Sequence, residues 1–228
     1  MFDFVARRRD LSASYIKQLH QALTRHQETV QAVDQLGRPT EVRLLRGDWK
    51  QLPNNPTRPD GDIHEYCPPE HVAAEMDRLI AMDMEHAQRD IPPEIEAAWI
   101  HHSFTQIHPF QDGNGRIARS LASLVFLRDE WFPLVVTRDT REEYIAALEE
   151  ADAGSLSALV DLFTRTQKKA FVQALSLSEN LLHQISPLQQ VLASATDKLR
   201  ARKQSNVKQM QSKAFELSKA LEGYAEET

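Results

Sequence analysis

The residues most able to do chemistry stand together in one segment, His108-Pro109-Phe110-Gln111-Asp112-Gly113-Asn114-Gly115-Arg116. Two of only seven glycines, Gly113 and Gly115, fall within it, and glycine lets a loop turn several backbone N–H groups toward one point. Helical spacing of apolar residues resumes at Ile117, so the loop also precedes a helix N-terminus, whose dipole favours negative charge. The pattern indicates a phosphate-binding loop.

Charged side chains in the same stretch suit a polyphosphate. Arg116 and Arg119 are three residues apart, so they lie on neighbouring positions of the following helix, where guanidinium groups can hold phosphate oxygens. Asp112 offers one hard oxygen, enough for a Mg²⁺ that is otherwise held by phosphates and water. His108 has an unperturbed pKa near neutrality and is a candidate general base. Each residue alone has an ordinary explanation, as a helix end, a turn or a solvated arginine, but their co-occurrence favours phosphate-group transfer.

The stretch HPFQDGNGRIAR, residues 108–119, resembles the Fic-family motif H-P-F-x-[D/E]-G-N-G-R-x-x-R and matches it at every specified position. Weaker similarity extends over roughly residues 11–175. It includes a first core helix around residues 15–20, a flap over the site around residues 47–54, and residues 66–69 before a proline-started helix. The resemblance implies an all-α fold: a Fic-type helical bundle with a β-hairpin flap over the active site and a helical C-terminal extension.

The resemblance also implies an activity, the Mg²⁺-dependent transfer of AMP from ATP to a hydroxyl side chain of a target protein. His108 would take the proton from that hydroxyl, and Phe110 would anchor the loop in the core. The other implied roles are Mg²⁺ binding by Asp112, α-phosphate binding by Gly113, Asn114 and Gly115, β-phosphate binding by Arg116, γ-phosphate binding by Arg119, and adenine contact by Tyr144. The identity of the target is not encoded in the motif.

Other activities share this motif. One variant of the family phosphorylates its target and carries a lysine where this chain has Gly115, so the glycine favours AMP transfer. Transfer of another phosphate-linked group, or removal of AMP from a modified protein, would use the same residues. A non-catalytic interaction or nucleic-acid-binding module is the alternative outside the enzyme class, suggested by the basic run over residues 198–213. The net charge of −6 and the lack of interleaved aromatic residues argue against nucleic acid.

Prolines and apolar spacing predict the elements that position the loop. We expect an N-terminal segment over residues 1–10, a Fic core over 11–175 and a helical extension over 176–228. Within the core we expect helices over residues 11–33 and from Pro68-Pro69 to about Arg89, a third from Pro92-Pro93 to the loop, and a hairpin flap at about residues 42–66.

The C-terminal extension carries two further features. An apolar stripe between Leu181 and Leu199 is interrupted at Ser186-Pro187, and it would pack on the core or on another subunit, which leaves a homodimer open. Ser218-Lys219-Ala220-Leu221-Glu222-Gly223 matches the pattern [S/T]-x-x-x-E-[G/N] of the family's inhibitory helix. By that resemblance, Ser218 and Glu222 would belong to an inhibitory element whose glutamate pairs with Arg119.

Composition sets the remaining bounds. The 228 residues include a single cysteine, Cys67, so no intrachain disulfide is available and a reducing compartment is favoured. The apolar runs are far shorter than the ~18 residues that a membrane-spanning helix requires. The N-terminus lacks the pattern of a secretory signal. We therefore expect a cytoplasmic protein with no membrane segment.

Overall fold

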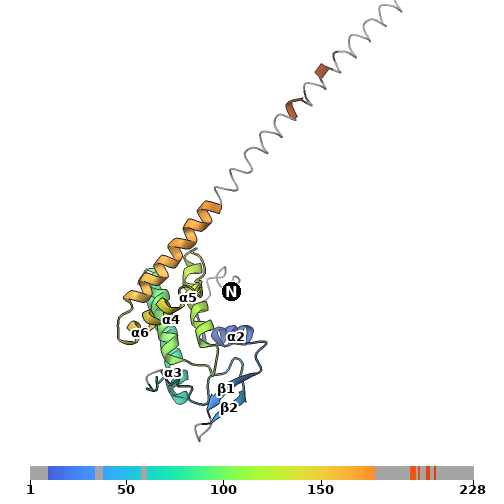
Figure 1. The fold of residues 1–228 in the computed structure, drawn as a ribbon. Coiled ribbons are helices and arrows are strands. Elements are labelled where there is room, and N and C mark those ends of the chain that lie inside the picture. The colour runs from blue at the N-terminus through green and yellow to red at the C-terminus, as the bar shows by residue number, and fades with distance from the viewer. Residues whose placement is uncertain are drawn as a thin grey trace, which may run out of the picture. The chain divides into compact units, whose positions relative to one another are not determined.

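The computed structural model describes residues 10–33, 38–57 and 61–177, and a few positions between 196 and 208. The chain divides into two compact units, Met1–Phe171 and Val172–Thr228, where the sequence predicted a boundary after residue 175. The site and all labelled elements belong to the first unit (Figure 1).

Helices dominate this unit, which confirms the predicted helical class. Proline begins two of them: Pro69 starts the short 3-10 helix η1 (Pro69–His71), which leads into α3 (Val72–Gln88), and Pro93 starts α4 (Pro93–Ile107). The first helical turn needs no N–H from these residues, so proline is tolerated there. After the loop come α5 (Asn114–Arg128) and α6 (Arg141–Asp152), and residues 157–171 are helical.

The first described helix, α2 (Ala13–Leu23), is shorter than predicted. The hydroxyl oxygen of Ser12 caps it by accepting from the Tyr15 N–H at 3.2 Å. At its other end the Thr24 hydroxyl donates to the carbonyl oxygen of His20 at 2.7 Å. The helix predicted over residues 11–33 is thus wrong beyond residue 23, because the β-branched Thr29 and Val30 begin a strand.

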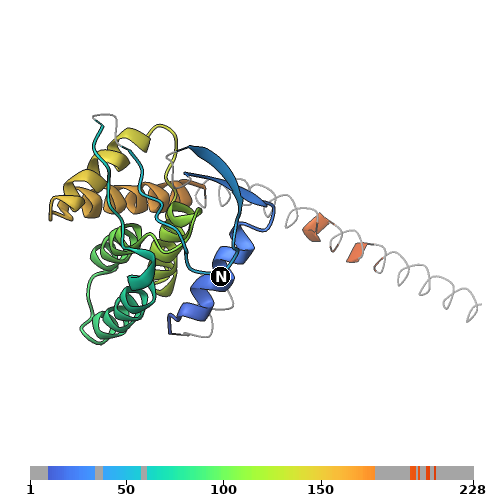
Figure 2. The same cartoon turned by 90° about the horizontal axis from the view of Figure 1, so that it is seen from below.

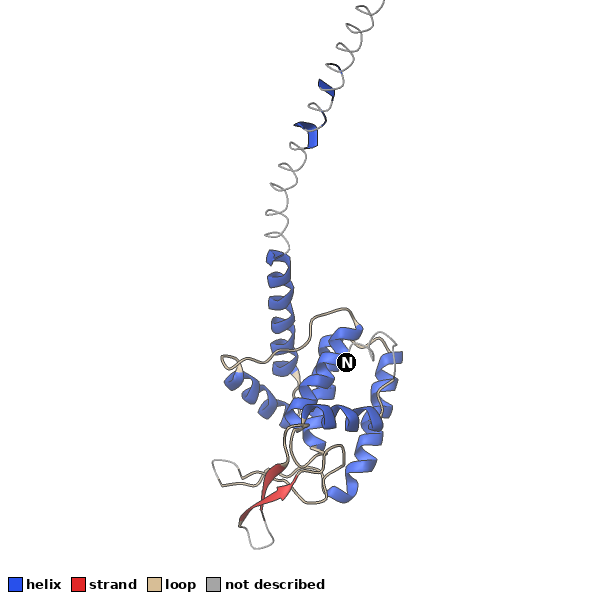
Figure 3. Cartoon of the chain, turned by 90° about the vertical axis from the view of Figure 1, so that its right-hand side faces the viewer, coloured by secondary structure: helices blue, strands red, loops and turns tan. Residues whose placement is uncertain are grey.

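The single sheet in the described part of the chain is an antiparallel pair, β1 (Thr29–Val33) and β2 (Pro39–Arg43), with Thr29 opposite Arg43. Figure 3 shows it as the only red ribbon, and Figure 2 shows it beside α2. The hairpin predicted at residues 42–66 is therefore misplaced toward the C-terminus. Among the described residues of that range, strand-like pairing past β2 is limited to a bridge between Thr57 and Ile63, because prolines at 53 and 56 cannot donate to a ladder.

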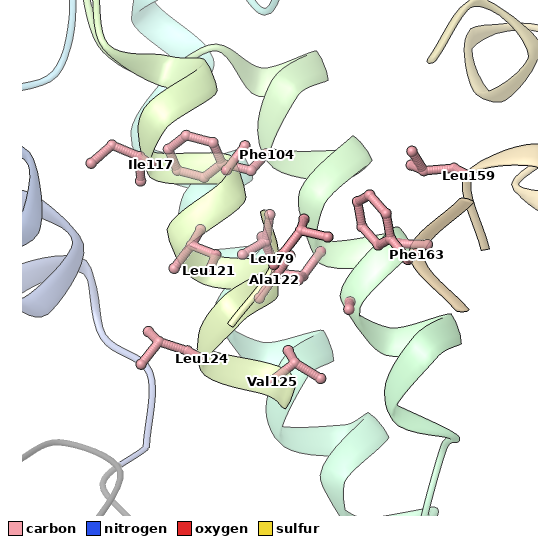
Figure 4. Packing of buried hydrophobic residues seen from close by; sticks show 14 of the residues in the cluster. Leu79, Phe104, Ile117, Leu121, Ala122, Leu124, Val125, Leu159 and Phe163 are labelled. Atoms are coloured by element: carbon pink, nitrogen blue, oxygen red, sulfur yellow. The ribbon is translucent and has the colours of Figure 1, made fainter. Parts of the chain in front are cut away.

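The core lies between α4 and α5, which pack along each other, and it is closed by α3, α2 and residues 157–171. Figure 4 shows apolar side chains of α5 in this core, among them Ile117, Leu121, Ala122, Leu124 and Val125. Phe110 from the loop is fully buried in the same cluster, as predicted. The loop is therefore fixed at both ends by helices and in the middle by an aromatic anchor.

None of the helices in the described ranges combines the length and the apolar character that crossing a membrane requires.

Candidate functional site

Residues 108–113, hereafter the motif loop, join α4 to α5 through two left-handed backbone positions. His108 caps the C-terminus of α4 with φ = 47°, and Gly113 precedes the first turn of α5 with φ = 84°. A left-handed backbone is unfavourable for histidine, so the surroundings must hold it. Asn114 supplies part of that hold: its side-chain oxygen accepts from the Phe110 N–H at 2.9 Å, and its Nδ2 donates to the Phe110 carbonyl at 2.6 Å.

The imidazole of His108 is oriented from two sides. Its Nδ1–H donates to the carbonyl oxygen of Thr105 at 3.1 Å, which leaves Nε2 as the proton acceptor. Its ring stacks on Tyr66, with centroids 3.7 Å apart and planes 11° apart. Burial, reinforced by the positive charge of Lys50, lowers the pKa of His108 to about 4. At neutral pH the imidazole is uncharged and can accept a proton.

Asp112 is joined to Arg116 through Gln27, which comes from the segment between α2 and β1. The Gln27 Nε2 donates to Asp112 Oδ2 at 2.5 Å, and its Oε1 accepts from the Arg116 guanidinium at 2.6 Å. A guanidinium nitrogen of Arg116 and Oδ2 of Asp112 are 3.8 Å apart. Partial burial opposes the charge of Asp112, but the hydrogen bonds from Gln27 and from the Gly113 N–H hold its pKa below the usual value. Asp112 is therefore an ionised carboxylate, half exposed and able to meet a cation.

Arg119 lies one helical turn beyond Gly115. A Cβ added to Gly115 would stand 3.4 Å from the Arg119 guanidinium, an ordinary van der Waals contact, so the two positions are neighbours. Tyr144 in α6 is 8% exposed, and its hydroxyl is 2.9 Å from Nε2 of the fully buried His101. Burial raises the pKa of Tyr144, and the neighbouring Arg119 opposes that rise. Tyr144 is thus placed beside Arg119, and its predicted contact with adenine stays a prediction.

His20 of α2 packs against the motif loop. It is not among the site residues predicted from the sequence. It is fully buried, and its ring stacks on Phe110 with centroids 3.8 Å apart. Its Nδ1 accepts from the Gly47 N–H at 2.8 Å, so the other nitrogen carries the proton and donates to the Asp112 carbonyl at 3.0 Å. Burial lowers the pKa of His20. This favours the neutral imidazole, in which one ring nitrogen donates and the other accepts. His20 therefore ties the motif loop to the chain around residue 47.

A cleft of about 880 Å³ opens beside the loop. His108, Gln111 and Asp112 form one wall, and Gln27, Thr29, Val30, Gln31 and Glu41 from the hairpin region form another. Residues 52–55 and Ile63 complete its lining. The hairpin therefore lies at the cleft, where a flap was predicted. It is formed by residues 29–43, whereas the flap was predicted at about residues 42–66. The cleft is large enough for an extended small ligand or a peptide segment.

The structure brings His108, Asp112 and Arg116 together at or next to the cleft. Arg119 lies on the next turn of α5, with Tyr144 of α6 beside it. Gly113, Asn114 and Gly115 form the start of α5 between them. Ser218 and Glu222 lie outside the described residues, so the inhibitory element stays a prediction. Within the described part of the chain no three His, Cys, Asp or Glu side chains form a metal-binding group. The predicted role of Asp112 as a Mg²⁺ ligand stays a prediction.

Comparison with protein families gives one match relevant to this loop. The model of the Fic/DOC family matches residues 10–126. The protein adenylyltransferase fic-1 of Caenorhabditis elegans is 35% identical over 92 residues, which cover 40% of this chain and 18% of that protein. The protein adenylyltransferase Fic of Drosophila melanogaster is 29% identical over 131 residues, 58% of this chain and 26% of that protein. The chain thus spans about a fifth to a quarter of these relatives.

Solved structures share the fold. A Fic-domain-containing signalling protein from Bacteroides thetaiotaomicron superposes with a TM-score of 0.66 at 23% identity, covering 75% of this chain and 65% of that one. Fic-1 from C. elegans superposes with a TM-score of 0.60 at 22% identity, covering 75% of this chain and 45% of that one. At these identities the likeness concerns the arrangement of the helices and the hairpin.

Proposed function

Because this chain belongs to the Fic/DOC family, we propose that it is a protein adenylyltransferase, which transfers AMP from ATP to a serine, threonine or tyrosine hydroxyl of a target protein. The observation that carries the proposal is the neutral His108 imidazole, with Nε2 free to accept a proton, beside a cleft that also holds Asp112. The names of the related adenylyltransferases support the same reaction class.

In this reaction His108 takes the proton from the incoming hydroxyl group. The hydroxyl oxygen forms a bond to the α-phosphorus of ATP, and the bond from that phosphorus to the α,β-bridging oxygen breaks. Pyrophosphate leaves with the electron pair of the broken bond. A general base of this kind contributes roughly 10²–10⁴-fold to the rate, so most of the acceleration comes from alignment and charge stabilisation.

The N–H groups at the start of α5, around Gly113 and Gly115, and the helix dipole stabilise charge on the α-phosphate. Asn114 serves this site by shaping the loop, since both ends of its amide are bonded to Phe110. Arg116 and Arg119 bind the β- and γ-phosphates. To bind there, Arg116 exchanges its bond to the Gln27 side-chain oxygen for one to a phosphate oxygen.

Asp112 would hold a Mg²⁺ ion that ATP brings with its phosphates. Its low pKa and half-exposed position suit a hard cation, which would neutralise charge on the leaving pyrophosphate. Gly115 favours this reaction over phosphorylation, because the phosphorylating variant of the family carries a lysine at that position. We further propose that the protein acts in the cytoplasm, that its partner is a protein substrate, and that Glu222 restrains Arg119.

Peptide mass spectrometry of a cell lysate incubated with the protein, ATP and Mg²⁺ tests this proposal. Peptides that carry AMP on serine, threonine or tyrosine should appear with the parent protein and be missing with His108→Ala. Peptides that gain phosphate alone would favour the kinase reading. An equal yield of AMP-peptides with both proteins would contradict the role of His108.

A further inference from the structure

Lys50 is a buried cation next to the motif loop. It lies in the chain between β2 and η1, and it is only 3% exposed. Its Nζ donates to the side-chain oxygen of Asn54 at 2.9 Å. Among the described residues no carboxylate pairs with it. Burial lowers its pKa to about 8, so the ammonium form dominates at neutral pH.

Burying an ammonium group without an anionic partner is costly, because the neutral amide oxygen of Asn54 replaces only part of its hydration. A methionine or leucine would fill similar space at a lower cost. Such residues occur disproportionately at functional sites, where the charge itself is used. The neighbours of Lys50 show where its charge acts.

Lys50 reaches the motif loop by two routes. Its backbone N–H donates to the carbonyl oxygen of Pro109 at 2.8 Å. Through its side chain it holds Asn54, whose Nδ2 donates to the carbonyl oxygen of Phe110 at 2.8 Å. These two carbonyl groups directly follow His108, the residue with the unfavourable left-handed backbone. Lys50 and Asn54 therefore fix the part of the loop that sets the direction of the imidazole.

The charge of Lys50 also acts on the imidazole. Its Nζ lies 5.8 Å from the centroid of the Tyr66 ring, and that ring stacks on His108. The groups that face His108 from each packed element are the carbonyl oxygen of Thr105 in α4, Lys50 after β2, His64 and Tyr66 before η1, and Asp112 in the motif loop. Lys50 is the one lysine or arginine among them, and its positive charge opposes a second positive charge on His108.

We propose that Lys50 is a positioning residue for His108: together with Asn54 it holds the motif loop in place, and its charge adds to burial in disfavouring the protonated imidazole. The assignment of proton acceptance to His108 rests on the proposed function. Mutations can test two effects of Lys50 separately. One is its hydrogen bonding to the loop through Asn54, the positioning half, and the other is the effect of its charge on His108, the electrostatic half.

Lys50→Met removes the charge with little change of shape, and Lys50→Arg keeps the charge. Lys17→Met is the matched control, because Lys17 is a surface lysine near Trp49 that pairs with Asp48 at 3.8 Å. Asn54→Ala keeps the Lys50 charge but removes the donor to Phe110. Thermal melts establish that each variant is folded, and Lys50→Gln is a second variant without the charge if Lys50→Met does not fold.

The first measurement is an NMR titration of the His108 ring, assigned by the signal that disappears in His108→Asn. It requires no transfer activity, so it tests the inference even if the proposed function fails. Lys50→Met should raise the pKa of His108 by about half a unit or more, whereas Lys50→Arg and Lys17→Met should leave it unchanged. An unchanged value in Lys50→Met, or an equal rise in Lys17→Met, would overturn the electrostatic half.

The second measurement is the rate of AMP transfer. Asn54→Ala should lower kcat about tenfold or more at an unchanged KM for ATP, without raising the pKa of His108, because alignment and not nucleotide binding is lost. A full kcat in Asn54→Ala, or a loss confined to KM, would overturn the positioning half.

Discussion

Asn114→Ala removes the side chain that closes the motif loop on itself. The residue is 1% exposed, and its amide makes two hydrogen bonds to the backbone of Phe110. In the variant the Phe110 carbonyl keeps the donor from Asn54, but the Phe110 N–H loses its partner. A lost hydrogen bond costs about 1 kcal/mol, and a buried N–H left without a partner costs about 1–3 kcal/mol. We therefore expect the free energy of unfolding to fall by about 3 kcal/mol.

Urea denaturation at neutral pH, followed by circular dichroism, measures this loss. Asn55→Ala is the matched control, since Asn55 is exposed and its side chain accepts a single hydrogen bond, from the Tyr66 N–H at 3.0 Å. That variant should lose at most about 1 kcal/mol. A loss in Asn114→Ala no greater than that in Asn55→Ala would refute the reasoning, because the loop would then not depend on the Asn114 amide.

Further expectations concern the base, the pH dependence and the inhibitory element. His108→Ala should abolish AMP transfer and change the calorimetric Kd for ATP less than about threefold, because the base acts on the incoming hydroxyl. In the parent, the acid limb of kcat/KM should lie near pH 4 and not near 6.5, since burial and Lys50 lower the pKa of His108; a limb near 6.5 would contradict this. Glu96, 2.6 Å from His86, has its pKa raised by burial to about 7. Its folded-state pKa exceeds the unfolded value, so its contribution to stability is greatest below about pH 4.5 and is lost as the pH rises to about 7. Glu96→Gln should therefore gain stability relative to the parent between pH 5 and 8 in urea titrations, and a constant difference would argue against a shifted Glu96. Glu222→Gly should raise transfer about tenfold or more if Glu222 pairs with Arg119, and an unchanged rate would leave that segment without an inhibitory role.

Local patterns in the sequence predicted the helices and the motif loop. Proline at the start of α4, helical spacing in α5 and the glycines at positions 113 and 115 all act within a few residues of one another. These features were predictable because the contacts that create them are short in sequence. The burial of Phe110 was instead implied by the resemblance to the Fic family, because its ring contacts His20 and Trp49, which are far from it in the sequence.

The residues that the sequence did not identify all act over long separations. His20 and Asp112 are 92 positions apart, and Gln27 and Asp112 are 85 apart. Nothing near Gln27 in the sequence marks it as the link between Asp112 and an arginine. The predicted position of the hairpin is wrong for a different reason. The prediction continues the helical spacing of α2 past Thr24, although the β-branched residues that follow favour a strand.

The central claim is that the α-phosphate of ATP, and not the γ-phosphate, is transferred to protein. The most direct measurement incubates the protein, Mg²⁺ and a cell lysate with ATP labelled at the α-phosphate, and in parallel with ATP labelled at the γ-phosphate. The account predicts that protein becomes labelled from the α position only, and that His108→Ala removes this label. Protein labelled from the γ position, or α-label that persists undiminished in His108→Ala, would contradict it.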